Sequence, residues 1–410
     1  MAIICGTDLS HASLGALSVA RALAAVRGDQ EVVLVHVVDA DAEGEIEHLR
    51  AAMEAQIDHL GPGVTIRPEL VVGPAETALT SFAETENSEL VVIAAGGRDT
   101  LGSTAAKIIA ITQTPLLVVR DPAPWLAFCD KSRPLKVLAA VDESIASELC
   151  LQWTHGLRAI GPVEVVLGGV YYPDDASEHY GLHAKTLVDR DPEIEQLLAR
   201  DMLHRFVETA GVVARTRRGL GRIGAHLIEL ATEEKVDTII IGTSQKTGLG
   251  RLGSVSSIVV EEAPQSVVCV PPNATLPTFV MPSMSTALVA TDLSPFANRG
   301  VAYAYAAVPE GGEIHIAHVI DHDAEIDEGD IMRQLLAQAP RSAKVRKVTA
   351  YIVRGENAAT AIAQTAARLG VDFITIASHG RSGITRALMG SVADRLLRAT
   401  RKPVLVLRPG

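Results

Sequence analysis

Cysteine is scarce in this chain, and no cysteine is close to another. The 410 residues contain Cys5, Cys129, Cys150 and Cys269. No Cys-x-x-Cys pair and no metal-ligand spacing occur among them, so the sequence predicts neither a disulfide framework nor a zinc site. This use of cysteine fits a reducing compartment and favours the cytoplasm.

Aromatic residues and positive charge are also in short supply. Phe, Trp and Tyr make up 3% of the chain, and the formal net charge is -12. Few aromatic rings leave few platforms on which bases could stack, and net negative charge repels phosphate backbones and anionic lipid surfaces. The composition argues against nucleic acid and membrane as partners and leaves small ligands open.

Long apolar runs are missing as well. No stretch approaches the roughly 20 apolar residues that a membrane-spanning helix needs. The amino terminus has no basic leader, and Asp8 interrupts its apolar run, so no signal sequence is expected. Because 48% of the residues are hydrophobic and 21% are charged, the sequence predicts a folded, cytoplasmic protein.

What the chain does contain is one pattern repeated three times. A β-branched apolar run ends in an acidic residue at 3–8, 137–142 and 288–292. A segment rich in Ala and Leu follows, and then a second apolar run, which predicts strand, helix and strand. The expected second strands are 31–38, 163–170 and 313–319.

Later strands follow the same pattern in every copy. The expected fourth strands are 90–94, 238–242 and 373–377. A Gly-Ser pair then opens a helical segment at Gly102-Ser103, Gly253-Ser254 and Gly390-Ser391. The expected fifth strands are 116–119, 267–270 and 404–407. Apolar strands that alternate with helices predict parallel sheets covered on both faces.

The fold class that follows is α/β, with three tandem doubly wound parallel sheets of five strands each. Proline-rich segments without periodicity separate the copies at 121–134 and 271–285, as expected of connectors between domains. We therefore place the domains at 1–122, 135–272 and 285–410.

The third copy has the richest set of residues at the carboxyl ends of its strands, where doubly wound sheets bind ligands. Its first strand runs into Asp292, and its fourth runs into the glycine-containing loop 377–391. Glycines let backbone N–H groups approach phosphate oxygens, and a following helix amino terminus adds favourable polarity. This loop is the candidate anion site of the chain.

The loop 377–391 and the closing segment 402–407 resemble the nucleotide-binding signature of the universal stress protein family, Gly-x2-Gly-x9-Gly-Ser/Thr. The third copy matches it at Gly380, Gly390 and Ser391 and has Ala377 in place of the first glycine. The resemblance implies a Rossmann-like fold of the adenine nucleotide alpha hydrolase-like type. The resemblance in fold covers nearly the whole chain.

The resemblance implies a stress-response module that binds ATP or a related adenine nucleotide, with or without Mg²⁺. Asp292 and Val319 would contact the adenosine end. The residues that the resemblance assigns to the nucleotide are Ala290, Thr291, Asp292, Val319, Ala377, His379, Gly380, Arg381, Gly383, Gly390, Ser391 and Val392.

The signature is degenerate in the other two copies. The second copy has Gly242 in the first position but Gln245 in the second, with seven residues between Gln245 and Gly253. In the first copy only four residues separate Gly97 from Gly102. The loop of the second copy is shorter than the family pattern, and that of the first copy is too short to be expected to wrap a triphosphate. The nucleotide is therefore expected mainly in the third copy.

Three other signals are weaker. Two Gly-x-Gly-x-x-Gly strings, at 219–224 and 248–253, lack the preceding first strand of a dinucleotide site. His315, His318 and His322 could be metal ligands, but the odd spacing of the first two should place them on opposite faces of a strand. A basic cluster is either a solvated face or an anion site, and it consists of Arg215, Arg217, Arg218 and Arg222.

No Gly-x-Ser-x-Gly elbow, Walker A string or paired acid and base is visible, so no dedicated catalysis is expected beyond weak ATP hydrolysis, which the resemblance implies at most. Two functions remain open. One is a nucleotide-binding signalling module, and the other is a structural or interaction scaffold with empty sites.

Fifth strands pair in the family, and two of the three can pair within the chain, so the third suggests a homodimer.

Overall fold

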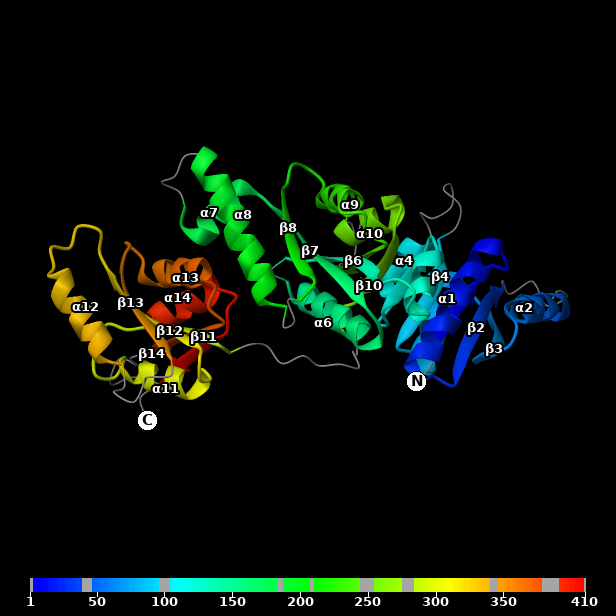
Figure 1. Cartoon of the computed structure of the whole chain (residues 1–410), viewed down its shortest axis with the longest axis horizontal. Helices are drawn as coiled ribbons and strands as arrows, with labels where there is room; N and C mark the ends of the chain where they lie inside the picture. Colours follow the sequence, from blue (N-terminus) through cyan, green and yellow to red (C-terminus); the bar gives the residue numbers. More distant parts are fainter. Residues whose placement is uncertain are drawn as a thin grey trace. The chain divides into compact units, whose positions relative to one another are not determined.

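The computed structural model describes residues 3–38, 46–95, 104–142, 144–182, 187–206, 210–243, 254–274, 284–339, 346–377 and 391–408. The chain divides into two compact units. The first comprises residues 1–170 and 208–280, and the second comprises residues 171–207 and 281–410 (Figure 1). Within the described residues, no helix is both long and apolar enough to cross a bilayer.

The first repeat forms a parallel five-stranded sheet with the strand order β3-β2-β1-β4-β5. Its strands are apolar and almost wholly buried in the middle of the sheet, as strands covered on both faces must be. The strands are β1 (Ile3–Thr7), β2 (Glu31–Val38), β3 (Thr65–Val72), β4 (Leu90–Ala94) and β5 (Leu116–Val119). The helices are α1 (His11–Arg27), α2 (Ile46–Leu60), α3 (Ala75–Thr85) and α4 (Thr104–Ile111).

The second repeat has the same strand order, β8-β7-β6-β9-β10. Its strands are β6 (Leu135–Ala140), β7 (Val163–Tyr171), β8 (Val212–Arg218), β9 (Thr238–Gly242) and β10 (Ser266–Val270). The helices of this repeat in the first unit are α6 (Ile145–Ile160), α9 (Ile223–Glu233) and α10 (Val255–Glu262). Two further helices, α7 (Pro173–Tyr180) and α8 (Leu187–His204), lie between β7 and β8 in sequence but belong to the second unit.

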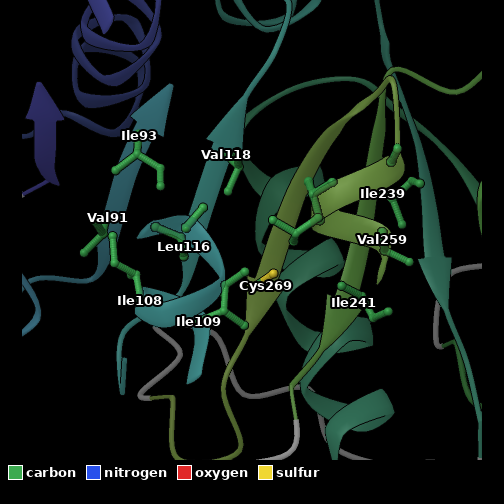
Figure 2. Packing of buried hydrophobic residues seen from close by; sticks show 14 of the residues in the cluster. Val91, Ile93, Ile108, Ile109, Leu116, Val118, Ile239, Ile241, Val259 and Cys269 are labelled. Atoms are coloured by element: carbon green, nitrogen blue, oxygen red, sulfur yellow. The ribbon is translucent and has the colours of Figure 1, made fainter. Parts of the chain in front are cut away.

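The first two sheets join into one ten-stranded sheet through an antiparallel pair, β5 with β10. Leu117 faces Val268 at the centre of this pair, and both are fully buried. Figure 2 shows Leu116 and Ile108 of the first repeat in the same apolar cluster as Cys269 and Val259 of the second. The expected pairing of two fifth strands within the chain is therefore confirmed, and the two repeats share one core.

The connector between these repeats contains a helix, α5 (Ala123–Cys129), which the lack of periodicity did not indicate. Asp121 Oδ1 accepts a hydrogen bond from Ala123 N (3.0 Å) at its start. Trp125 and Phe128 are buried and contact each other edge to face, with ring centroids 6.2 Å apart. Two large aromatic side chains thus anchor a segment that composition alone marks as a linker.

The third repeat forms a separate parallel sheet in the second unit, with the order β13-β12-β11-β14-β15. The strands are β11 (Thr286–Ala290), β12 (Glu313–Ile320), β13 (Lys347–Arg354), β14 (Phe373–Ala377) and β15 (Val404–Leu407). The helices are α11 (Arg299–Ala307), α12 (Glu328–Ala337), α13 (Ala358–Leu369) and α14 (Ser391–Ala399). Separate apolar clusters cover the two faces of this sheet.

The predicted α/β class with mostly parallel strands is confirmed. β6 and β11 begin and end two residues before the runs expected at 137–142 and 288–292, and β1 ends one residue before Asp8, the end of its expected run. The bounds of the other expected strands agree with the sequence pattern, except that β7, β10 and β12 are each one residue longer. The reason is that a strand buried on both faces has no polar side, so its apolar run coincides with its length.

Candidate functional site

The candidate site lies at one edge of the third sheet, where the carboxyl ends of three neighbouring strands meet. Ala290, the last residue of β11, pairs with Ala317 of β12 on one side and with Ile376 of β14 on the other. Val319 and Ala377 lie just beyond those partners. The register therefore brings together Ala290, Val319 and Ala377, three of the residues that the resemblance assigned to the nucleotide.

The turn after β11 is held in an uncommon conformation. Leu293 has a positive φ of 65°, which non-glycine residues rarely adopt. Two hydrogen bonds stabilise it: Leu293 N donates to Thr291 Oγ1 (3.0 Å), and Ser294 N donates to Asp292 Oδ1 (2.9 Å). Asp292 itself is exposed. The turn thus presents a carboxylate of fixed position beside the strand ends.

Two side chains from other elements hold Thr291 in place. Its hydroxyl donates to Asn298 Oδ1 (2.8 Å), and its carbonyl oxygen lies 2.9 Å from Nδ1 of His318 on β12. Because a carbonyl oxygen can only accept, Nδ1 must carry the hydrogen, which leaves Nε2 of a neutral ring as an acceptor. Thr291 is only 6% exposed, so it stabilises the turn from its buried side.

The remaining assigned residues divide into two groups. Ser391 and Val392 are exposed and begin α14, whose first-turn backbone N–H groups lack helical partners. A helix start of this kind favours an anion. Five assigned residues lie outside the described part of the chain: His379, Gly380, Arg381, Gly383 and Gly390.

The first repeat builds nearly the same turn, which glycine counting did not reveal. Leu9 has φ of 64°, and its N–H donates to Thr7 Oγ1 (2.9 Å). His36 Nδ1 lies 2.8 Å from the carbonyl oxygen of Thr7. One difference is that Thr7 Oγ1 contacts Gln56 Oε1 of α2 (2.9 Å). The shared string Thr-Asp-Leu-Ser, at 7–10 and 291–294, was the available signal.

The second repeat lacks the threonine of this turn, because Val141 stands in its place. Asp142 accepts a hydrogen bond from Ser144 N (2.8 Å), as the matching aspartates do in the other repeats, and a second one from Ser147 Oγ (2.5 Å). Gly242, the glycine that matches the family signature, packs against α6: a Cβ there would lie 2.5 Å from the Cβ of Ala146. Its small size is explained by packing, so it is no evidence for a phosphate site.

Three arginines of the basic cluster in the second repeat form ion pairs. Arg215 pairs with Glu234, Arg217 with Glu229 and Glu233, and Arg222 with Glu262. This paired arrangement favours the solvated-face interpretation of the basic cluster over an anion site.

Among the described residues, the glycine string at 219–224 and the histidines show no further site. Gly224, which ends the string at 219–224, packs in α9, where a Cβ would lie 2.7 Å from Ile258. The string at 248–253 lies outside the described residues. His315 is buried beside Glu313, and burial lowers its pKa. In the described part of the chain, no three His, Cys, Asp or Glu side chains are placed to hold a metal ion.

Comparison with known proteins adds a family. The chain matches the model of the universal stress protein family over residues 1–120, 135–271 and 284–408. A universal stress protein of Mycobacterium tuberculosis (strain ATCC 25618 / H37Rv) is 28% identical over 198 residues, which are 44% of this chain, and the chain spans 64% of that relative's length. One of Mycolicibacterium smegmatis is 25% identical over 67% of this chain and 97% of the relative.

Comparison with solved structures also finds universal stress proteins. A universal stress protein from Archaeoglobus fulgidus DSM 4304 is 16% identical, covers 66% of this chain and 96% of its own, and has a TM-score of 0.48. A universal stress protein in complex with cAMP is 23% identical, covers 29% of this chain and 97% of its own, and has a TM-score of 0.26.

Proposed function

Because the chain belongs to the universal stress protein family, we propose that its third repeat binds ATP or a related adenine nucleotide. In this proposal the protein is a cytoplasmic stress-response module, and nucleotide occupancy changes how it associates. One observation carries the proposal: the turn Thr291–Ser294 lies beside the carboxyl ends of β12 and β14.

The residues present fit such a ligand. Asp292 supplies an exposed acceptor of fixed position, and half-buried Val319 supplies an apolar surface for the adenosine end. The loop glycines Gly380 and Gly390, with the α14 start at Ser391, would hold the phosphates through backbone N–H groups. Mg²⁺ would accompany a triphosphate by neutralising its charge. Binding without dedicated catalysis is the proposed activity, with weak ATP hydrolysis as its limit.

Calorimetric titration of the full chain with ATP, ADP, AMP and cAMP tests this function. We expect at least one of them to bind, and Gly390→Asp to abolish binding because a carboxylate would repel the phosphates. Gly253→Asp, the matching change in the second repeat, should leave binding intact. The absence of binding at about 1 mM, a weak limit, would contradict the proposal, as would full binding by Gly390→Asp.

The alternative function is a scaffold that binds no nucleotide. Ala377 in place of the first glycine and the short loops of the first two repeats favour it, as does the firm β5–β10 junction. The same titration separates the two, because a scaffold would bind none of the nucleotides, and Gly390→Asp would then leave its assembly unchanged.

We also propose that the third repeat pairs with that of a second copy through β15. In the described residues β15 pairs only with β14, and Leu405 at its centre is 38% exposed. The matching residues Leu117 and Val268, which face each other in the β5–β10 pair, are fully buried. An antiparallel β15 pair would set Leu405 opposite its own counterpart, as a two-fold axis requires.

The helix α14, which precedes β15, supports the same proposal. Seven residues after the glycine of each Gly-Ser pair, Ile109 is 3% exposed and Val260 is fully buried, whereas Leu397 is 42% exposed. The first two are covered because α4 and α10 pack together across the β5–β10 junction. The third repeat thus exposes the surface that its sister repeats bury against each other.

A further inference from the structure

The helices α7 and α8 come from the second repeat but complete the second compact unit together with the third repeat. In the first and third repeats, the segment between the second and third strands forms a helix that packs on its own third strand, α2 on β3 and α12 on β13. In the second repeat the corresponding pair instead packs on α13 of the third repeat. Such a crossing is not part of the repeated pattern.

The α7–α8 pair has an apolar core of its own. Tyr171, Tyr180, Ile194 and Leu197 are buried together between the helices. Tyr180 OH donates to Asp201 Oδ2 (3.0 Å), and Tyr171 OH donates to Glu195 Oε1 (2.9 Å). Among the described residues, the third repeat adds one residue, Ala367, to this cluster. The pair can therefore stay folded without α13.

The contact with α13 is polar and built around small residues. Gln364 Nε2 donates to the Glu178 carbonyl oxygen (3.0 Å), and Arg200 donates to the Ala367 carbonyl oxygen (3.0 Å). The chains approach closely at Gly370, where a Cβ would lie 2.9 Å from Arg200 Nε. Contacts made through polar groups of this kind resemble those between domains that separate and rejoin.

Among the described residues, a contact between a histidine and a carboxylate joins α8 to the sheet of the third repeat. His204 Nδ1 lies 3.1 Å from Asp372 Oδ1, and the Asp372 side chain is only 8% exposed. The other carboxylate oxygen of Asp372 accepts hydrogen bonds from Thr286 N (2.8 Å) and Thr286 Oγ1 (3.0 Å). Asp372 therefore links α8 with the starts of both β11 and β14.

From these contacts we propose that α7–α8 is a reversible clasp and that the outer face of α13, with Asp372, is its docking surface. The clasp is a folded helix pair with a few polar anchors, so it docks and releases as a body. When it is docked it protects α13 and the start of β14, and when it is released it exposes them. This proposal does not depend on the nucleotide.

Hydrogen exchange on the full chain tests whether the clasp protects α13. In the double variant Arg200→Ala/His204→Ala we expect amides of α13 to exchange roughly tenfold faster, because two charge-assisted anchors are lost. Gln196→Ala, on an exposed position of α8, is the matched control and should exchange like the parent. Unchanged exchange in α13 of the double variant would overturn the proposal.

A cross-link tests whether docking is reversible. In the variant Glu178→Cys/Gln364→Cys, a short reagent with two methanethiosulfonate groups would join α7 to α13 through disulfides that reduction removes, while the native cysteines are buried. If the clasp opens in the parent protein, the cross-linked form will exchange α13 amides more slowly than the reduced form. Equal exchange in both forms would show a permanently docked segment and would overturn the reversible clasp.

Discussion

His318 and Thr291 show how much of the candidate site depends on one hydrogen bond between strands. The imidazole on β12 holds the carbonyl oxygen of Thr291, whose hydroxyl in turn accepts from Leu293 N. The positive φ of Leu293 would be unfavourable without these partners. His318 is thus a positioning residue for the turn that carries Asp292.

Replacing His318 should weaken nucleotide binding. Loss of one hydrogen bond of ordinary strength predicts that the Kd of His318→Ala rises about three- to tenfold. His36→Ala removes the same bond from the first repeat and should leave the Kd unchanged, because the nucleotide is proposed to bind in the third repeat. Calorimetry on the full chain measures both. Equal affinities in the parent and His318→Ala would remove His318 from the site.

The pH dependence of stability should report Asp372. Burial alone would raise the pKa of this carboxyl, but hydrogen bonds from Thr286 and His204 and the charge of His204 bring it below the ordinary value of 3.8. The unfolded chain therefore takes up this proton at higher pH than the folded chain does. The stabilisation is complete above the ordinary pKa and is lost as the pH falls through the folded one.

Urea unfolding of the parent and of Asp372→Asn measures this contribution. We expect the variant to be less stable at pH 6, and the difference in unfolding free energy to shrink as the pH falls below 3.8, the ordinary carboxyl pKa. A difference that stays constant down to about pH 2 would mean that the lowered pKa of Asp372 contributes nothing.

At the scale of elements, the free edge of β15 is the feature with a direct test. Light scattering of the parent chain at micromolar concentration should give the mass of a dimer. Leu405→Lys should give a monomer, because it places two like charges opposite each other at the two-fold axis. Val213→Lys is the matched control, since Val213 is 39% exposed on another edge strand, β8. A monomeric parent would contradict the proposed dimer.

The sequence predicted those elements whose signal is local. Strands such as Leu90–Ala94 and Phe373–Ala377 agree with the apolar runs residue for residue, because burial on both faces leaves no polar positions. The helix α5 was missed because prolines mask a short segment whose only strong signal is Trp125 and Phe128. The docking of α7–α8 on α13 was not foreseen, because nothing local distinguishes a helix that covers its own sheet from one that covers another.

The candidate site was predictable only in part, for the same reason. Glycine spacing led to the loop before Ser391, but it took no account of His36 and His318, whose bonds join residues 29 and 27 positions apart. Glycine spacing also suggested that Gly242 belongs to a phosphate site, but Ala146 of α6 occupies the space that a Cβ at this position would need. A glycine that lets a phosphate approach and a glycine that lets a helix approach look alike in sequence.

At the scale of the whole molecule, the continuous ten-stranded sheet should make the first two repeats unfold together. Leu117→Ala removes a fully buried side chain from the β5–β10 junction, which should cost about 2–5 kcal/mol. Hydrogen exchange should then accelerate in β1 and β6 alike and remain unchanged in β11. Leu288→Ala, at a buried position of β11, should do the reverse. Acceleration confined to the first repeat would show that the junction is not cooperative.

The β5–β10 junction also bears on abundance. Its two strands belong to one chain, so the tether between them supplies a fixed local concentration, and the junction forms however little protein is present. A β15 junction between two copies has no tether and obeys mass action. A cell that makes more of this protein would leave the first unit as it is while filling β15 junctions. The β5–β10 pair would thus be independent of protein concentration, whereas the β15 pair would form more completely as that concentration rises.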